Sequence, residues 1–418
     1  MKLPKFAQVH QRFEAPVVED IGATTEAEVG QMIAQIGMAP GASVAVAAGS
    51  RGITNIAAII KHTVNALRHA GLQPFIVPAM GSHGGATSEG QLRVLNNYGI
   101  SESAMGCPVR SEIEPEFLGK TADDLPVYID RHALSADHIV IVNRIKPHTD
   151  FAGDIGSGLM KMMAIGLGKQ KGASFYHGSV FEYGFEHMIT SVSSIVMNKA
   201  PIAFGLAIIE NAYDQTAHIV GVPVDGLEQK ERELFQLANR LMPRLPFEDI
   251  DVLIVDQMGK NISGTGMDTN IIGRRMQNFE PEPVSPQILR IVVRDLTPES
   301  EGNAVGIGLA DFTTERLVNS INRDYTYINS ITGMGPQKAR IPVYFDTDRK
   351  VIEAAFQTIG MKAPESGRAV RIKNTLHLGE VSISEALMDE VAMRDDLEVN
   401  DSLTALPFDQ AGLLATLS

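Results

Sequence analysis

Short apolar runs alternate with helix-period segments along this chain, and that alternation limits the fold more than any other feature of the sequence. Buried strands are predicted at 43–48 and 137–143, and an amphipathic helix is predicted at 53–69. Strands separated by helices are typical of an α/β protein, in which helices cover a largely parallel sheet. Because 418 residues are too many for one ordinary core, we expect two α/β domains with an active site in the cleft between them.

A segment with two prolines marks the expected domain boundary. Residues 242–250, MPRLPFEDI, interrupt the periodicity, and a second alternation begins with a strand at 251–255. We therefore predict an N-terminal domain over 1–246, a C-terminal domain over 247–398, and a tail over 399–418 that could pack back on the N-terminal domain. The other predictions are a hairpin formed by 201–210 and 216–220, strands near 289–293, 341–345 and 369–373, and helices near 313–320 and 349–358.

The composition excludes several classes of protein. A net charge of −14 disfavours binding to nucleic acid or to an acidic membrane surface, because both require clustered cations. No apolar run is long enough to cross a bilayer, and the N-terminus lacks the apolar core of a signal peptide, so we expect a cytoplasmic protein. The single cysteine, Cys107, cannot form an internal disulfide or hold an iron–sulfur cluster. Any metal must therefore be held by histidine, by carboxylate or by a bound cofactor.

One stretch of the sequence concentrates the residues that can do chemistry. The segment KPHTDFAGDIGSGLMKMMAIGLGKQKGASFYH contains His148, Lys161 and His177, which can serve as base, covalent anchor and metal ligand. The glycine-rich turn at 155–158 can let the backbone approach a ligand closely. Upstream, the loop MGSHGGATSEG carries His83. This density indicates an active site.

The loops after three expected strands, at 43–48, 73–77 and 137–143, carry Arg51, His83 and His148. In open α/β sheets, ligands bind outside the carboxyl ends of the strands, so these residues are predicted to share a site. Basic residues also gather in this part of the chain: Arg144, Lys146, Lys161, Lys169 and Lys171. They indicate either a site for a small anion or a solvated basic face.

Taken together, these motifs resemble the lactate racemase family. They are GSRG at Arg51, GSHGGATSEG at His83, KPHTDFAGDIGSGLMK ending at Lys161, and His177 sixteen residues later. The resemblance continues through IIENAYDQTAHIVGVPVD at 208–225 and through SGTGMDTN in the second half. It implies a racemase or epimerase of a 2-hydroxy acid that carries a nickel-pincer nucleotide made by cofactor-assembly enzymes.

The resemblance also implies a role for each residue. Lys161 would carry the covalent link to the cofactor, and His177 would be the single protein ligand to nickel. His83 and His148 would take and return the hydroxyl proton while hydride leaves C2 and comes back on either face. The other implied contacts are with the cofactor, through Ser50, Gly156, Ser157 and Gly158, and with the substrate, through Arg51, Arg274 and Arg275.

Several positions depart from the family pattern. The first loop reads Ala48-Gly49-Ser50-Arg51 where the family has Asp-x-Thr-Arg, and the chain contains no tryptophan that could pack against the methyl group of lactate. In the second domain, alignment on the SGTG turn brings Arg274 and Arg275 to the place of a family lysine. The first departure bears on how that loop places the cofactor, whereas the missing tryptophan and the arginines predict a substrate that is larger or more polar than lactate.

Two other functions are compatible with the same residues. In the first, His83 and His148 act without a metal, as the bases of an isomerase or lyase. In the second, the strand ends form a small-anion sensor without catalysis. The sequence does not define an oligomeric state.

Overall fold

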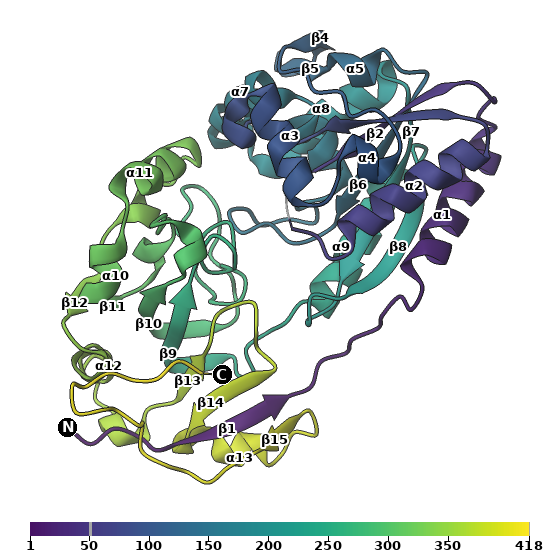
Figure 1. The fold of residues 1–418 in the computed structure, drawn as a ribbon. Helices are drawn as coiled ribbons and strands as arrows, with labels where there is room; N and C mark the ends of the chain where they lie inside the picture. Colours follow the sequence, from purple (N-terminus) through teal and green to yellow (C-terminus); the bar gives the residue numbers. More distant parts are fainter. Residues whose placement is uncertain (50–51, 418) are drawn as a thin grey trace. The chain divides into compact units, whose positions relative to one another are not determined.

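The computed structural model describes residues 1–49 and 52–417, with His177 described by its backbone alone. The chain divides into two compact units (Figure 1). The N-terminal unit comprises Ala15–His148 and Gly153–Met242, and the C-terminal unit comprises Met1–Glu14, Thr149–Ala152 and Pro243–Ser418. The passage at Pro243 falls within the segment where the sequence placed the domain boundary. The first fourteen residues, however, belong to the C-terminal unit.

The N-terminal unit is built on a five-stranded sheet of order β3-β2-β6-β7-β8. The first four strands run parallel and β8 pairs antiparallel with β7, which confirms the α/β class and the predicted hairpin. The sheet strands are β2 (Ser43–Ala48), β3 (Gln73–Pro78), β6 (His138–Arg144), β7 (Ile202–Glu210) and β8 (Thr216–Pro223). A separate antiparallel ribbon is formed by β4 (Pro115–Lys120) and β5 (Pro126–Asp130).

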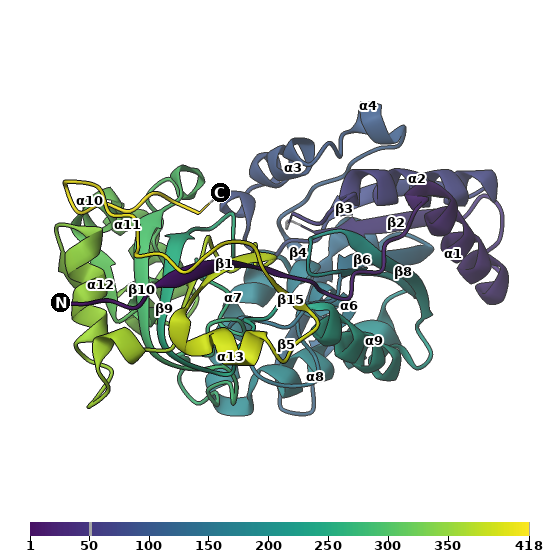
Figure 2. The ribbon, with the colours of Figure 1, turned by 90° about the horizontal axis from the view of Figure 1, so that it is seen from below.

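Helices cover both faces of this sheet. The helices of this unit are α1 (Ile21–Ile36), α2 (Ile56–His69), η1 (Gly84–Ala86), α3 (Ser88–Asn97), α4 (Glu102–Met105), α5 (Arg131–Leu134), α6 (Leu159–Lys161), the π-helix η2 (Met162–Gly166), α7 (Lys169–Tyr183), α8 (Phe185–Lys199) and α9 (Leu227–Leu241). Figure 2 shows α1 and α2 on one face, with α8 and α9 beyond the other. Helix α2 buries Ile56, Ile59, Ile60 and Leu67 against the strands, at the spacing of one helical face.

The order of the strands places the loops that carry the candidate residues. From β2, the chain continues to β3 on one side, and later to β6 on the other side. The strand order therefore reverses between β2 and β6, and ligands of open α/β sheets bind at such a switch point. The loops after β2, β3 and β6 all leave the sheet at this edge.

The C-terminal unit has an eight-stranded mixed sheet of order β12-β11-β10-β9-β13-β14-β1-β15. Strands β9 to β13 run parallel, whereas β14, β1 and β15 pair antiparallel. The strands are β1 (Phe6–Gln11), β9 (Asp249–Met258), β10 (Gln287–Leu296), β11 (Phe312–Thr314), β12 (Val343–Phe345), β13 (Ala369–Ile372), β14 (Glu380–Ser384) and β15 (Leu397–Val399). The helices are η3 (Pro298–Ser300), η4 (Ile307–Leu309), α10 (Glu315–Ser320), α11 (Arg323–Thr332), η5 (Pro336–Ala339), α12 (Asp348–Phe356), η6 (Pro364–Ser366), η7 (Glu385–Leu387) and α13 (Met388–Val391).

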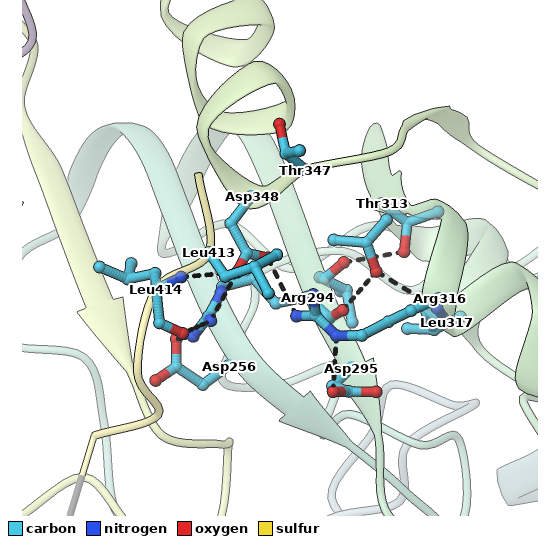
Figure 3. Close-up of polar contacts among 12 residues, drawn as sticks. Asp256, Arg294, Asp295, Thr313, Arg316, Leu317, Thr347, Asp348, Leu413 and Leu414 are labelled. Carbon is cyan, nitrogen blue, oxygen red and sulfur yellow. Dashed lines mark hydrogen bonds and ion pairs between the residues drawn. The ribbon is translucent and has the colours of Figure 1, made fainter. Parts of the chain in front are cut away.

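A buried group of charged side chains, which we call the Arg–Asp cluster, lies in the C-terminal unit. Its members are Asp256, Arg294, Asp348 and Arg371, each no more than 4% exposed. Arg294 donates to Asp256 at 2.6 Å and to Asp348 at 2.9 Å (Figure 3). Arg371 donates to both oxygens of Asp256, at 2.9 and 2.8 Å.

The C-terminal tail completes this cluster with its backbone. The Leu414 carbonyl accepts from Arg294, and the Leu414 N–H donates to Asp348 at 2.9 Å (Figure 3). The Leu417 N–H donates to Asp256 at 2.7 Å. The sequence had left open a return of the tail to the N-terminal domain. Instead, the tail packs on the C-terminal unit, because its backbone supplies the polar partners that the buried charges need.

Among the described residues, we find no helix with the length and apolar character needed to cross a membrane.

Candidate active site

A tight loop at the end of β6 holds the segment that carries Lys161. Lys146 and Ser157 exchange two backbone hydrogen bonds of 2.8 Å, which closes the loop between them. The Asn143 side chain donates to the Gly158 carbonyl at 2.8 Å. The segment Leu159–Lys161 therefore starts directly over the carboxyl end of β6.

The glycines of the IGSG turn are required by the packing of the chain itself. A Cβ atom on Gly156 would lie 2.4 Å from the Lys146 carbonyl oxygen, and one on Gly158 would lie 2.0 Å from a Glu231 oxygen. Neither position can hold a side chain without moving its neighbours. The sequence had explained these glycines by a close ligand approach, whereas the structure explains both by internal contacts.

His148 and Lys161 meet at one aromatic side chain, Phe185. The His148 and Phe185 ring centroids are 5.1 Å apart, and the Lys161 Nζ lies 6.0 Å from the Phe185 centroid. The Lys161 Nζ also donates to the Ser157 hydroxyl at 3.4 Å. His148 and Lys161 are both half-buried, whereas Phe185, the first residue of α8, is buried. An imidazole and an amine thus share an apolar wall. The sequence analysis missed Phe185, because a phenylalanine in a helix reads as a core residue.

The loop of His83 contacts the segment that follows Lys161. The Gly81 N–H donates to the Gly166 carbonyl at 3.2 Å, at the end of η2. Gly81 has a φ of +57°, a left-handed conformation that favours glycine. His83 follows as an exposed residue just before η1. The structure therefore brings the loops of His83, His148 and Lys161 to one edge of the sheet, as the strand-end pattern predicts.

Helix α7 carries His177 sixteen residues after Lys161. Its neighbour Tyr176 is fully buried, and the Tyr176 hydroxyl donates to the Pro126 carbonyl at 3.1 Å, which fixes α7 against β5. Burial raises the pKa of Tyr176, so the phenol stays neutral. Ser50 and Arg51, predicted to contact cofactor and substrate, lie outside the described residues.

The basic residues near the site serve different purposes. Arg144 pairs with Glu210, Lys169 is buried against Asp130, and the Lys171 Nζ lies 4.8 Å from the ring centroid of Tyr128. These contacts are dispersed over the N-terminal unit. Arg144 and Lys169 are thus held in ion pairs, whereas Lys171 is exposed.

Arg274 and Arg275 are engaged within the C-terminal unit. Arg274 donates to Asp311 at 2.9 Å and to the Leu309 carbonyl at 2.8 Å. Arg275 is 4% exposed and donates to Asn270 at 3.3 Å. Burial lowers the pKa of Arg275, although nearby carboxylates oppose the shift. The sequence-based substrate role of both residues stays a prediction.

Glu231 binds the backbone of the segment that carries Lys161. This carboxylate of α9 is fully buried, and it accepts the Met160 N–H at 2.9 Å, where α6 begins. Burial raises the pKa of Glu231 to about 7. A carboxyl group at the start of a helix satisfies backbone donors that have no partner within the helix. The sequence gives no sign of this residue, because it lies seventy positions from Lys161.

Glu231 should make stability depend on pH. Since its pKa is higher in the folded than in the unfolded chain, the folded state binds more protons between about pH 4.5 and 7, so stability falls as the pH rises through that window. The loss should approach about 3 kcal/mol at pH 8. Glu231→Gln should remove this pH dependence of stability. Urea unfolding at pH 5 and pH 8 would measure the difference. Glu233→Gln, on the exposed face of α9, is the control; parallel curves for wild type and Glu231→Gln would contradict the prediction.

The described residues contain no group of three or more histidine, cysteine, aspartate or glutamate side chains that could hold a metal ion. A metal held mainly by a cofactor needs only one protein ligand, and His177 is available in the sequence for that role. Covalent attachment needs a reachable amine, and Lys161 is half-buried on a short helix at the switch point. The half-buried amine of Lys161 therefore fits covalent attachment of a cofactor.

The N-terminal unit is thus an α/β module with an amine and two histidine loops at its switch point. Residues 32–186 match the family model described as the lactate racemase N-terminal domain. Over this segment, which is less than half of the chain, the protein is similar to that domain.

Two solved structures share the fold. The lactate racemase apoprotein from Thermoanaerobacterium thermosaccharolyticum aligns with a TM-score of 0.51 at 14% identity, covering 94% of this chain and 93% of that one. A protein from Thermotoga maritima aligns with a TM-score of 0.50 at 13% identity, covering 68% of this chain and 72% of that one. No curated protein matches the chain in sequence.

Proposed function

We propose that this protein is a racemase or epimerase that inverts C2 of a 2-hydroxy acid by hydride transfer. The observation that carries the proposal is the meeting of His148 and Lys161 at Phe185, in a segment that matches the lactate racemase N-terminal domain. In this arrangement, a proton acceptor and a point of covalent attachment share one wall of the site. That combination suits a cofactor enzyme better than a simple anion sensor.

Lys161 would hold a nickel-pincer nucleotide covalently, and His177 would be the protein ligand to nickel. When bound, this group supplies the acceptor for the hydride of C2. Neutral imidazole is a suitable ligand for Ni(II). The apolar ring of Phe185 would keep water away from the amine side of the site.

His83 and His148 would exchange the hydroxyl proton of the substrate. An unperturbed imidazole has a pKa of about 6.5, so it can take and return a proton near neutral pH. The two histidines come from loops after different strands, β3 and β6. Two separate bases are what a racemase needs, because the hydroxyl of each enantiomer must meet a base.

We propose a substrate that is larger or more polar than lactate, because the chain has no tryptophan to close the pocket around a methyl group. Dicarboxylic, aromatic and sugar 2-hydroxy acids are the candidates. The protein would act in the cytoplasm, after cofactor-assembly enzymes have loaded it.

Isotope retention distinguishes this proposal from its alternatives. The protein is expressed with cofactor-assembly enzymes and given each candidate acid deuterated at C2, in ordinary water. We expect the inverted product to keep its deuterium, because a hydride that leaves and returns does not exchange with solvent. Loss of deuterium to water would instead identify a metal-free base mechanism. Binding of an acid without inversion would identify a sensor.

A further inference from the structure

Lys169 is a buried cation that the proposed chemistry does not use. Its side chain is fully buried, and so is that of its partner Asp130, whose oxygen lies 2.7 Å from the Lys169 Nζ. Burial lowers the pKa of Lys169, while Asp130 opposes that shift. Asp130 is itself fixed, because it accepts the Ala133 N–H at 2.8 Å at the start of α5. Burying an ion pair is costly, so its position calls for a reason beyond packing.

The Lys169 ammonium directs its donors at three different elements. Besides Asp130, it donates to the Pro78 carbonyl at 2.6 Å and to the Gln91 Oε1 at 3.4 Å. Pro78 ends β3, and Gln91 lies in α3. An ammonium group has three donors and no acceptor, so Gln91 must turn its oxygen toward Lys169.

That orientation commits the other end of the Gln91 amide to the His83 loop. Its Nε2 donates to the Gly81 carbonyl at 3.0 Å and to the His83 carbonyl at 3.4 Å. Gln91 is fully buried, so water cannot replace these contacts. Lys169 therefore acts on the backbone of His83 through one intermediate side chain.

Lys169 is also the first residue of α7, the helix that contains His177. Its φ of +55° is a left-handed conformation that a residue with a side chain rarely adopts. Such a conformation persists only where the surroundings hold it, as the three contacts of the ammonium do here. The same lysine thus fixes the start of α7 and the loop of His83.

We propose that Lys169 is a positioning residue that sets the His83 loop relative to the start of α7. The inference rests on the proposed function, since His83 and His177 are site residues only there. A lysine that merely fills the core would stabilise the unit without controlling the loop. The two roles predict different behaviour of residues 81–86 when the contacts from Lys169 through Gln91 to the His83 loop are removed.

Gln91→Glu removes the hydrogen bonds from residue 91 to the His83 loop with little change in the shape of the side chain. Glutamate keeps an oxygen for Lys169 but loses the donors to Gly81 and His83. We expect hydrogen exchange at the His83 and Ala86 amides to rise roughly tenfold, because both are bonded within the loop. Thr63→Val, which removes a buried hydroxyl bond in α2 of the same unit, is the control and should leave that exchange unchanged. Unchanged exchange in Gln91→Glu would overturn the proposal.

A double variant tests Lys169 itself. Lys169→Met with Asp130→Asn removes both charges, so no unpaired ion is left in the core. We expect the same rise in exchange at residues 81–86, and in the loaded enzyme a fall in kcat with a smaller change in KM. If exchange rises in the double variant but the wild type inverts no hydroxy acid, the proposed function is wrong and the positioning role still holds. Loop exchange equal to wild type in the double variant would refute the role of Lys169.

Discussion

Lys161→Ala should abolish covalent loading and lower turnover beyond the ~10²–10⁴-fold that one general base contributes. The expected loss is this large because the cofactor, not a side chain, supplies the acceptor for hydride. Intact-mass analysis and nickel quantification, after expression with the cofactor-assembly enzymes, measure the loading. Wild type should show a mass adduct mapping to Lys161 and near-stoichiometric nickel. The alanine variant should show neither.

Lys171→Ala is the matched control for this loss. Lys171 lies ten positions further along the sequence, is exposed, and rests on the ring of Tyr128. Its removal should leave both adduct and turnover near wild-type values. An adduct that persists in Lys161→Ala, or that maps to Lys171, would show that the attachment point is wrong. Turnover that survives in Lys161→Ala without nickel would favour the metal-free isomerase.

Most of the parallel strands could be predicted from local patterns. The run at 43–48 is β2, the run starting at 251 lies within β9 (Asp249–Met258), and the predicted hairpin is β7 with β8. Strands β2, β7 and β9 are largely apolar and nearly fully buried, so their signal is contained in their own residues, whereas β8 is buried at only some of its positions. Sheet order carries no such signal. The position of a strand depends on partners elsewhere in the chain, such as β13 for β9.

Strand β1 shows what local patterns cannot reveal. Phe6–Gln11 pairs with Glu380–Ser384 and with Leu397–Val399, so the start of the chain completes the C-terminal unit. The prediction of a continuous domain over 1–246 was wrong for these residues. Thr149–Ala152 also belongs to the C-terminal unit, directly after His148. There, Lys338 pairs with Asp150, a contact across 188 positions that no spacing rule encodes.

The residues of the candidate site also fall into those that the sequence could predict and those that it could not. Residues whose chemistry is visible in their type, such as His148 and Lys161, could be selected from the sequence. Residues that act through their surroundings could not. Glu231 reads as one charge among many on α9, and Lys169 reads as part of a basic run, because burial and pairing arise only when distant segments meet. The functional prediction was therefore stronger for reacting groups than for the groups that hold them.

Arg294→Met should be the most damaging single change in the C-terminal unit, lowering its free energy of unfolding by about 3–5 kcal/mol. The substitution keeps the bulk of the side chain but removes the guanidinium that donates to Asp256, Asp348 and the Leu414 carbonyl (Figure 3). Arg371 still pairs with Asp256 and Arg316 still pairs with Asp348, but the buried group loses one of its positive charges and the Leu414 carbonyl loses its donor. Removal of residues 413–418 should have a related effect, because the cluster then loses the tail's backbone partners.

Urea unfolding followed by circular dichroism would measure both changes, with hydrogen exchange assigning the loss to β9, β10 and β13. Lys350→Ala provides the contrast, since the Lys350–Asp346 pair is exposed and should contribute little to stability. If Arg294→Met proved no more costly than Lys350→Ala, the Arg–Asp cluster would not stabilise the sheet. If the truncation were neutral while Arg294→Met was costly, the cluster would be complete without the tail. The tail would then be only a covering segment.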